Sequence, residues 1–575
     1  MKKLLSCLLA LALASSLTVP MASATGYTDI PAGSSLAGEV QKAVDYGLMN
    51  GYSAETFGYS DTMTRVQFVT VLDRMVGWSA SYDVKIAMWT IPFKAMEISE
   101  DAISPVYLPG IEEAVRHDVV DRDSPFRPND PITRGEMAEM MVRALGLKEV
   151  ARQLDASSPS MPYSDTYSVL HGGTPFTDLP WGKTGYITVA YAIGMANGTS
   201  ATTFSPNATA TRAQAAAMLV RIYEKLHREP DFVHGFYAIS SYSQLDLAEN
   251  MDAVSAGWSR MTWDGETALL STTSVNGNEY NIPSGYGEVT ERLESSGVPL
   301  NLSVFMEGDS LTAMLASESG RKQAVEQIIQ EVTVDYKTIG KNPYSGVTID
   351  FEGLRGDQQA DFVTFLTELD RELEQLGKTL YVCVSPVLAE GYDKSYSGYD
   401  YAAIGALADR VILMAYDYDT RDMSQFVGTE YYKTAATAPI HQVYLGLRII
   451  TEKMDASKVA LGFSAKNTAW QIDENGKLLS GTPGHPSAET VARRLAQTGT
   501  EFGWSDTYQQ PYAIYTTEDG SRYFLWYQDS RSVQTALNAA RLLGVSGVSI
   551  WRLGNIPLYT IGGHDWSWGG LLHNS

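Results

Sequence analysis

The sequence predicts a multidomain protein in which α-helical repeats precede a (β/α)8 TIM barrel that carries a small α+β insertion. Three observations predict this fold class. The 575-residue chain is too long for one hydrophobic core. Its N-terminal part repeats one helical plan three times. Its C-terminal part contains eight apolar strand candidates, most of them separated by amphipathic helical stretches.

Residues 1–24 have the pattern of a secretory signal peptide. Two lysines precede an apolar run from Leu4 to Leu17, and Ala22-Ser23-Ala24 is a small-residue cleavage site. The run is too short for a spanning helix, and no later segment has the length of one, so we expect no membrane span. The prediction is a secreted protein.

Composition restricts the partners and cofactors. The net charge of −24 argues against general attraction to DNA, anionic lipid or an anionic wall polymer, so no nucleic-acid partner is expected. Without the signal peptide only Cys383 remains, so no internal disulfide is possible. The sequence has no zinc-type Cys/His cluster and no phosphate-binding Gly loop, and we expect neither a metal nor an organic cofactor. The oligomeric state stays open.

Each repeat combines a first helix, a turn and a second helix that follows a Thr-Arg-x-Glu/Gln segment. The Thr can cap the second helix, and Gln67, Glu136 or Gln214 three residues later completes a capping box. The expected boundaries of the repeats are 25–92, 93–150 and 151–227, followed by a linker at 228–231.

The arginine of this segment is Arg65, Arg134 or Arg212. It projects from the first turn of a helix, where backbone N–H groups also point at an anion. Because a cation is disfavoured at a helix N-terminus, an arginine kept there indicates an anionic partner.

The segment from residue 27 to about 227 resembles S-layer homology domains through the three Thr-Arg-x-Glu/Gln signatures. The resemblance implies a three-pronged helical unit that binds a secondary cell-wall polymer, often pyruvylated, with the three arginines at the ligand-binding position. Gln67 and Gln214 stand where Glu is usual, which leaves the arginine intact but bears on its orientation. The expected location is the cell wall or S-layer of a Gram-positive-type bacterium.

The barrel is expected at residues 232–560, with an insertion at about 467–533 and a C-terminal tail at 561–575. The insertion should contain a helix from Ala488 to Gln497 and a hairpin turned at Asp519-Gly520. The eight strands are expected at Val233–Ile239, Ala253–Trp258, Leu300–Met306, Gly346–Glu352, Leu380–Pro386, Arg410–Tyr416, Val459–Phe463 and Val548–Leu553.

The fourth strand carries two carboxylates one pleat apart. Apolar and polar residues alternate from Val347 to Glu352, so Asp350 and Glu352 point to the same side. Two carboxylates held this close cannot both ionise freely, and one pKa must rise. A carboxylic acid kept protonated near neutral pH can donate a proton to a leaving group, as glycosidic bond cleavage requires. Taken alone, the pattern fits equally well a buried strand whose acids lie at a solvated mouth.

Other strand ends contribute to the same mouth, because reactive residues in such barrels lie at the carboxyl ends of the strands. Met414, Tyr416 and Asp417 follow the sixth strand, and Trp551 lies on the eighth. Acids, a phenol and an indole at one mouth are typical of a sugar-binding site.

Residues 232 to about 556 resemble glycoside hydrolase family 18, nearest to the branch that acts in spore germination and on peptidoglycan. The family pattern Asp-Gly-x-Asp-x-Asp-x-Glu places its last Asp at Asp350 and its Glu at Glu352. Ser345 and Thr348 occupy the two earlier acidic positions. Thr348 can form hydrogen bonds but cannot take up a charge, so the departure affects the expected pH profile and rate.

The resemblance implies substrate-assisted, retaining cleavage of a glycan that contains N-acetylglucosamine. Glu352 would protonate the glycosidic oxygen, Asp350 would orient the acetamido N–H, and Tyr416 would bond to the acetamido group. Met414 and Asp417 would line the subsite, and Trp551 would form its floor. Peptidoglycan is the expected substrate, with chitin-type glycans next.

Two alternatives remain open. The barrel could bind sugars without cleaving them, a reading that Ser345 and Thr348 favour and that Asp350, Glu352 and Tyr416 oppose. The whole chain could instead be a structural S-layer-associated protein. Endo or exo action, the exact glycan and the physiological role are not predicted.

Overall fold

The structure is a computed structural model. It describes residues 26–78, 104, 107–121, 124–155, 174–180, 182–273, 280–386, 398–419, 422–558, 560–561 and 564–573. The predicted signal peptide therefore lies outside the described residues. The chain divides into two compact units, one of residues 1–141 and 205–223 and the other of residues 142–204 and 224–575.

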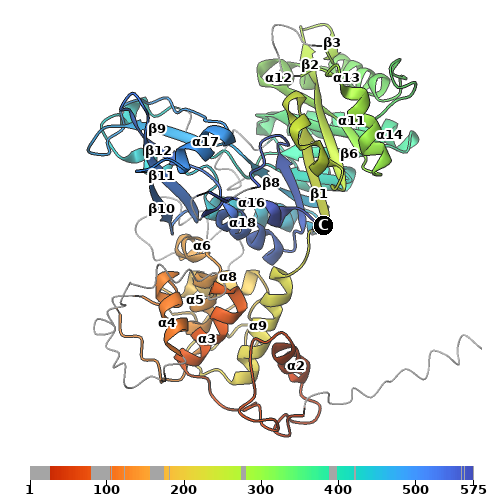
Figure 1. The fold of residues 1–575 in the computed structure, drawn as a ribbon. Coiled ribbons are helices and arrows are strands. Elements are labelled where there is room, and N and C mark those ends of the chain that lie inside the picture. Colours follow the sequence, from red (N-terminus) through yellow and green to blue (C-terminus); the bar gives the residue numbers. More distant parts are fainter. Residues whose placement is uncertain are drawn as a thin grey trace, which may run out of the picture. The chain divides into compact units, whose positions relative to one another are not determined.

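The N-terminal repeats are helical, as predicted (Figure 1). The second helix of each repeat begins at the arginine of its Thr-Arg-x-Glu/Gln segment, while the short α6 was not expected. The helices are α2 (Ala37–Asp45), α3 (Arg65–Val76), α4 (Leu108–Arg116), α5 (Arg134–Ala144), α6 (Lys148–Leu154), α8 (Thr184–Ala192) and α9 (Arg212–Leu226).

The predicted capping boxes are present at the starts of α3, α5 and α9. The N–H of Gln67 donates to Thr64 Oγ1 over 3.4 Å, and the N–H of Thr64 donates to Gln67 Oε1 over 3.1 Å. The same pair of bonds joins Thr133 to Glu136 and Thr211 to Gln214 at 2.9–3.2 Å. Glutamine therefore replaces glutamate in this role without loss of the cap.

A ring of backbone hydrogen bonds joins the segments that precede α3, α5 and α9. The N–H of Met63 donates to Ala210 O, that of Ala210 to Ile132 O, and that of Ile132 to Met63 O, at 3.2, 3.1 and 2.8 Å. In this ring each repeat contacts the other two.

The first N–H of each of these helices also donates to a neighbouring repeat. The N–H groups of Arg65, Arg134 and Arg212 reach the carbonyls of Asp130, Ala208 and Asp61 at 3.0, 2.9 and 2.9 Å. The expectation that these N–H groups point at an anion is therefore wrong, because carbonyls of neighbouring repeats already accept hydrogen bonds from them.

The second part of the chain contains the predicted closed barrel. Its eight parallel strands follow one another in chain order, and β1 pairs with both β2 and β13, which closes the sheet. The strands are β1 (Phe232–Tyr237), β2 (Ala253–Trp263), β4 (Leu300–Glu307), β5 (Gly346–Glu352), β6 (Thr379–Val384), β7 (Arg410–Leu413), β8 (Val459–Ser464) and β13 (Gly547–Trp551). The fold class and all eight strands are confirmed.

Amphipathic helices surround this barrel (Figure 1). They bury one apolar face each, as α14 does with Phe362, Phe365 and Leu369. The main ones are α11 (Tyr286–Ser295), α12 (Gly308–Ala316), α13 (Glu318–Glu331), α14 (Gln359–Gln375), α15 (Tyr401–Leu407), α16 (Ile440–Lys453) and α18 (Ser530–Leu542). A short strand, β3 (Ala268–Ser271), extends β2 as an antiparallel hairpin that was not predicted.

The insertion is a four-stranded antiparallel sheet with one helix. The strands β9 (Thr468–Ile472), β10 (Glu501–Ser505), β11 (Gln510–Thr516) and β12 (Arg522–Trp526) lie in the order β10-β11-β12-β9, and α17 spans Ala488–Leu495. Its core contains buried aromatic rings, among them Trp470, Phe524 and Trp526.

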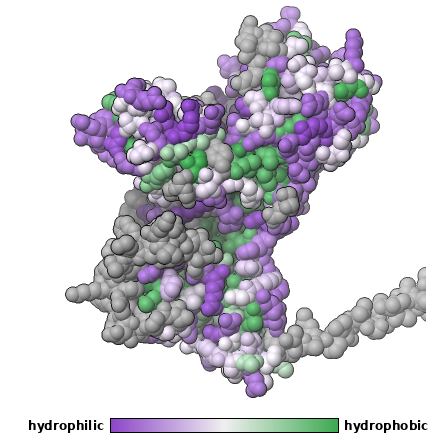
Figure 2. Space-filling model, in the orientation of Figure 1, coloured by the Kyte–Doolittle hydropathy of each residue, from purple (hydrophilic) through white to green (hydrophobic). Residues whose placement is uncertain are grey.

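The surface of this second part is mostly hydrophilic on the face shown in Figure 2. Within the described ranges, no helix has both the length and the apolar character needed to cross a bilayer.

Candidate active site

The barrel brings the predicted acids to its mouth. Asp350 and Glu352 are the last inward-facing residues of β5, in register with Phe305 and Glu307 at the end of β4. Because all eight strands are parallel, their carboxyl ends meet at one rim. Met414, Tyr416, Asp417 and Trp551 stand at the ends of β7 and β13, on the same rim.

Asp350 lies below Glu352 and is nearly inaccessible. It is 5% exposed, whereas Glu352 is half-buried. Burial and then the neighbouring Glu352 carboxylate raise the pKa of Asp350 well above its usual value, while the thiol of Cys383 on β6 donates a hydrogen bond to it. The expected rise in one carboxyl pKa therefore falls on Asp350.

One oxygen of Asp350 lacks a partner. Within the part of the chain that the structure describes, Oδ1 is buried and forms no hydrogen bond. A buried polar atom without a partner is costly to the fold, so a ligand that donates a hydrogen bond to Oδ1 would remove this cost.

Tyr416 stands against the barrel wall close to the acids. A Cβ at Gly462 on β8 would lie 2.6 Å from Tyr416 Cε1, so only glycine leaves room for the ring. Burial, followed by Asp417 and Asp350, raises the pKa of the Tyr416 phenol well above its usual value, so it stays a proton donor. Asp417 is exposed and has φ 58°, a left-handed conformation that Asp tolerates.

Met414 and Trp551 cover the apolar layer beneath the mouth. Both are half-buried, and the Trp551 ring meets Phe236 edge to face at 5.1 Å. The layer consists of Phe232, Phe236, Ala253, Tyr381, Cys383, Ile412 and Ala460. Trp551 therefore packs on this apolar layer, and its role as a subsite floor stays a prediction.

A buried polar chain crosses the barrel interior at the level of Thr348. The hydroxyl of Thr348 bonds to Ser255 Oγ at 2.6 Å, and His234 bridges Ser255 and Ser549 at 2.7 and 2.8 Å. Full burial lowers the pKa of His234 to about 3, so the imidazole is neutral. The interior around Thr348 is thus satisfied by hydroxyl groups and a neutral ring, with no second carboxylate.

Sequence reasoning missed this chain and Cys383. The signal was present, because His234, Ser255 and Ser549 each occupy an inward position of an otherwise apolar strand. It also missed Asp419, a buried carboxylate after β7 that accepts hydrogen bonds from Lys466 Nζ at 2.9 Å and Thr468 Oγ1 at 3.0 Å.

The three arginines of the repeats lie elsewhere in the chain and are almost buried. Arg65, Arg134 and Arg212 are 9%, 9% and 6% exposed. Arg65 donates to Phe126 O at 2.6 Å and pairs with Glu136 of the next repeat at 2.5 Å. An ion pair within the protein thus helps to hold Arg65, and its role in polymer binding stays a prediction.

Arg212 is held in a different way. It donates to Phe57 O and Asn50 O at 3.0 and 2.7 Å and lies 4.3 Å from the centre of the Tyr52 ring. Carbonyl and aromatic groups, which carry no net charge, leave this guanidinium able to attract an anion.

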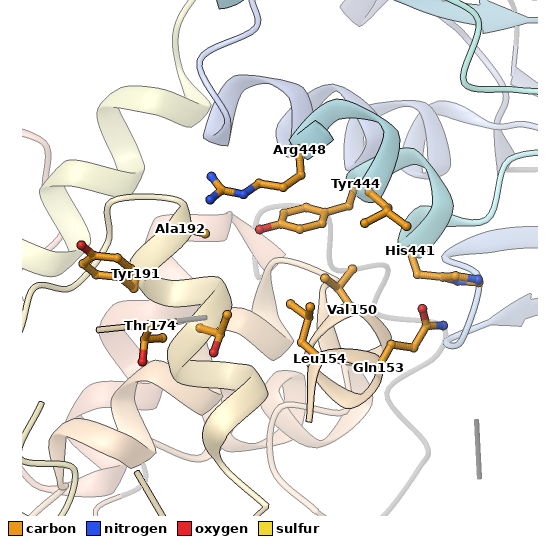
Figure 3. Close-up of a pocket in the computed structure, with 11 residues that line it drawn as sticks. Val150, Gln153, Leu154, Thr174, Tyr191, Ala192, His441, Tyr444 and Arg448 are labelled. Atoms are coloured by element: carbon orange, nitrogen blue, oxygen red, sulfur yellow. The ribbon is translucent and has the colours of Figure 1, made fainter. Parts of the chain in front are cut away.

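A separate pocket lies between α6, α8 and α16 (Figure 3). Val150, Tyr191, His441, Tyr444 and Arg448 are among its lining residues. None of the predicted site residues lines it, so it is distinct from the barrel mouth. In the described residues no group of three or more His, Cys, Asp or Glu side chains is arranged to hold a metal ion.

Comparisons with known proteins agree with the fold and the repeats. Profiles of the S-layer homology domain match residues 26–69, 101–138 and 175–216, and a profile of glycosyl hydrolases family 18 matches residues 286–555. The second match leaves β1 and β2 outside its limits.

Among curated proteins, the cortical fragment-lytic enzyme of Bacillus subtilis is 25% identical over 43% of this chain and 53% of its own length. The surface-layer 125 kDa protein of Lysinibacillus sphaericus is 29% identical over 38% of this chain and 17% of its own length. The chain spans about half the length of the first curated relatives it matches, 53% and 49%.

Among solved structures, the C-terminal domain of a putative chitinase from Desulfitobacterium hafniense is 21% identical, with a TM-score of 0.47 over 57% of this chain and 95% of that one. From the profile matches, the chain contains three S-layer homology domains and, in its C-terminal part, belongs to glycosyl hydrolases family 18.

Proposed function

We propose that this protein is a secreted, wall-anchored enzyme that cleaves β-1,4 bonds of glycans containing N-acetylglucosamine by substrate-assisted, retaining catalysis. The observation that carries the proposal is the buried Oδ1 of Asp350, which has no hydrogen-bond partner among the described residues and lies next to Glu352 at the barrel mouth. The acetamido N–H of a bound sugar is a donor of the kind this oxygen lacks.

In this mechanism Glu352 gives its proton to the glycosidic oxygen as the bond from that oxygen to the anomeric carbon breaks. The acetamido oxygen of the same sugar attacks the anomeric carbon and closes an oxazolinium ring. Asp350 orients the acetamido group by accepting its N–H at Oδ1, and the carboxyl disperses the positive charge of the ring. Water then attacks the anomeric carbon and gives a proton to Glu352, which restores the acid.

Tyr416 and the apolar floor complete the subsite. The raised pKa of Tyr416 keeps its hydroxyl protonated, so it can donate to the acetamido oxygen. Met414 and Asp417 line the sugar, and Trp551 lies beneath it. Thr348 bonds to Ser255 at 2.6 Å, so a hydroxyl replaces the carboxylate that the family usually has at this position.

The repeats would hold the enzyme at its substrate. S-layer homology domains support attachment to a secondary cell-wall polymer, with Arg65, Arg134 and Arg212 as the binding arginines. A relative named as a cortical fragment-lytic enzyme supports peptidoglycan as the first substrate, and chitin-type glycans, which carry the same N-acetylated sugar, are the second.

Glu352→Gln tests the proposal. The wild type should release reducing ends from purified peptidoglycan or from chitin oligosaccharides, and the variant should lose about 100- to 10,000-fold of that rate while it still binds the glycan. Equal release by both proteins would contradict the proposed role of Glu352. Glycan binding without release by the wild type would instead favour a non-catalytic carbohydrate-binding or structural protein.

A further inference from the structure

Arg260 lies at the same level of the barrel mouth as Asp350. Arg260 on β2 is in register with Phe305 on β4, and Phe305 is in register with Asp350 on β5. Side chains in register on parallel strands point to the same face, and neighbouring strands are about 4.8 Å apart. Arg260 therefore faces the mouth two strands, or roughly 10 Å, from Asp350.

Two stacked rings support the guanidinium. Tyr280 and Phe305 stack with centroids 4.9 Å apart and planes 6° apart. Arg260 Cζ lies 5.8 Å from the Tyr280 centroid and 5.5 Å from the Phe305 centroid. This platform holds the arginine at the mouth through cation–π attraction, which uses none of its N–H donors.

Arg260 has almost no anionic partner of its own. Within the described ranges no hydrogen bond reaches its guanidinium, and its ion pair with the exposed Glu307 spans 3.9 Å. An ion pair at this distance and exposure contributes little. By contrast, Arg292 on α11 binds Glu249 and Asp246 at 2.6 Å. Arg260 thus presents unused donors beside the acids.

The net negative charge of the protein makes a cation at the barrel mouth important for recognition of an acidic ligand. The protein has a net charge of −24, so an acidic polymer gains nothing from its general field. Any recognition of an acidic glycan must come from a local cation, and Arg260 stands beside Asp350 and Glu352 at the mouth.

We propose that Arg260, supported by Tyr280 and Phe305, forms a subsite for a carboxylate that the glycan carries close to the cleaved bond, such as the lactyl carboxylate of a muramic acid residue. This inference rests on the proposed function and specifies its substrate class as acidic N-acetylated glycans. A guanidinium can bind a carboxylate with two parallel hydrogen bonds, which a neutral glycan cannot offer.

The experiment compares kcat/KM for three oligosaccharides of equal length in the full-length protein. One contains only N-acetylglucosamine, one alternates it with N-acetylmuramic acid bearing a free carboxylate, and one is the methyl ester of the second. The wild type should prefer the free carboxylate over its ester by about 10- to 100-fold, the size of a charge-assisted hydrogen bond.

Arg260→Met should abolish that preference. Arg260→Lys should keep part of it, since a lysine retains the charge but cannot form two parallel hydrogen bonds to a carboxylate. The matched control is Arg371→Met, which removes an exposed arginine of α14 and should leave the preference unchanged. Added salt should reduce the preference of the wild type but not of Arg260→Met.

A wild type without preference for the carboxylate overturns the inference, as does an Arg260→Met variant that loses the same factor on all three substrates. Both outcomes leave the proposed function intact provided that Glu352→Gln is inactive on every substrate. A wild type that cleaves none of the three would contradict the proposed function itself.

Discussion

At the scale of single residues, the site depends on a carboxyl group placed where the fold alone would not favour it. Asp350 is 5% exposed, and one of its oxygens has no partner among the described residues. Burial and the Glu352 carboxylate raise its pKa. The folded protein therefore binds this proton more tightly than the unfolded chain does, and stability falls as the pH rises through the raised pKa.

Asp350→Asn should consequently stabilise the protein at neutral pH while it abolishes cleavage. An amide cannot ionise, so the cost of a buried carboxylate disappears, whereas at pH 4 the wild-type carboxyl is already protonated. Thermal unfolding followed by circular dichroism should show a Tm gain on the order of 2–4 °C at pH 7, equivalent to about 1 kcal/mol, and a smaller gain at pH 4. A gain that is larger at pH 4 than at pH 7 would refute the assignment.

At the scale of elements, the sequence predicted regular segments well and local extensions poorly. The barrel strands are buried on both faces, so their apolar runs stood out, as in β8 (Val459–Ser464). The strand β3 (Ala268–Ser271) has only four residues and exposes an apolar one, Leu269, so its sequence does not alternate. The strand β10 (Glu501–Ser505) is largely uncovered and has no apolar run to detect. The hydrogen bonds between the starts of α3, α5 and α9 were not predicted either, because no local sequence pattern reveals bonds between repeats.

Left-handed turns at equivalent positions of the repeats end their first helices. Gly47 after α2 has φ 71°, Gly194 after α8 has φ 70°, and Asp118 after α4 has φ 55°. A Cβ at Gly47 would meet no atom within 4 Å, so the cost of replacing it is conformational only.

Gly47→Ala should therefore lower the free energy of unfolding by about 1 kcal/mol. Gly38→Ala is the matched control, since Gly38 lies inside α2, has open space at its Cβ and should gain roughly 0.5–1 kcal/mol from helix propensity. Urea unfolding of the full chain measures both. Equal effects of the two substitutions would disprove the role of the left-handed turn.

At the scale of the whole molecule, three S-layer homology domains and a family 18 barrel occur in one chain. The repeat signatures and the Asp350/Glu352 strand made both predictable, because each depends on residues close together in sequence. The Cys383 contact to Asp350 and the Arg260 platform were not predictable, because each joins strands that are distant in the chain.

For wall attachment, the triple variant Arg65→Ala, Arg134→Ala, Arg212→Ala should no longer pellet with purified cell walls. The side chains of Arg65 and Arg212 also bond to carbonyls of neighbouring repeats, so a thermal melt must accompany the assay. The matching single Arg→Lys variants keep the charge with less loss of packing, and they should pellet better than the alanine variant. Undiminished pelleting of a folded triple variant would remove the anchoring proposal.

The most direct test of substrate-assisted cleavage compares kcat for two substrates. One is an N-acetylated oligosaccharide, and the other is the same oligosaccharide after N-deacetylation of the sugar at the cleaved bond. If that sugar's own amide is the nucleophile, its removal should reduce kcat by at least about 100-fold even when the substrate saturates the enzyme. Comparable kcat values for the two substrates would show that some other group attacks the anomeric carbon, and would contradict the role given to Asp350.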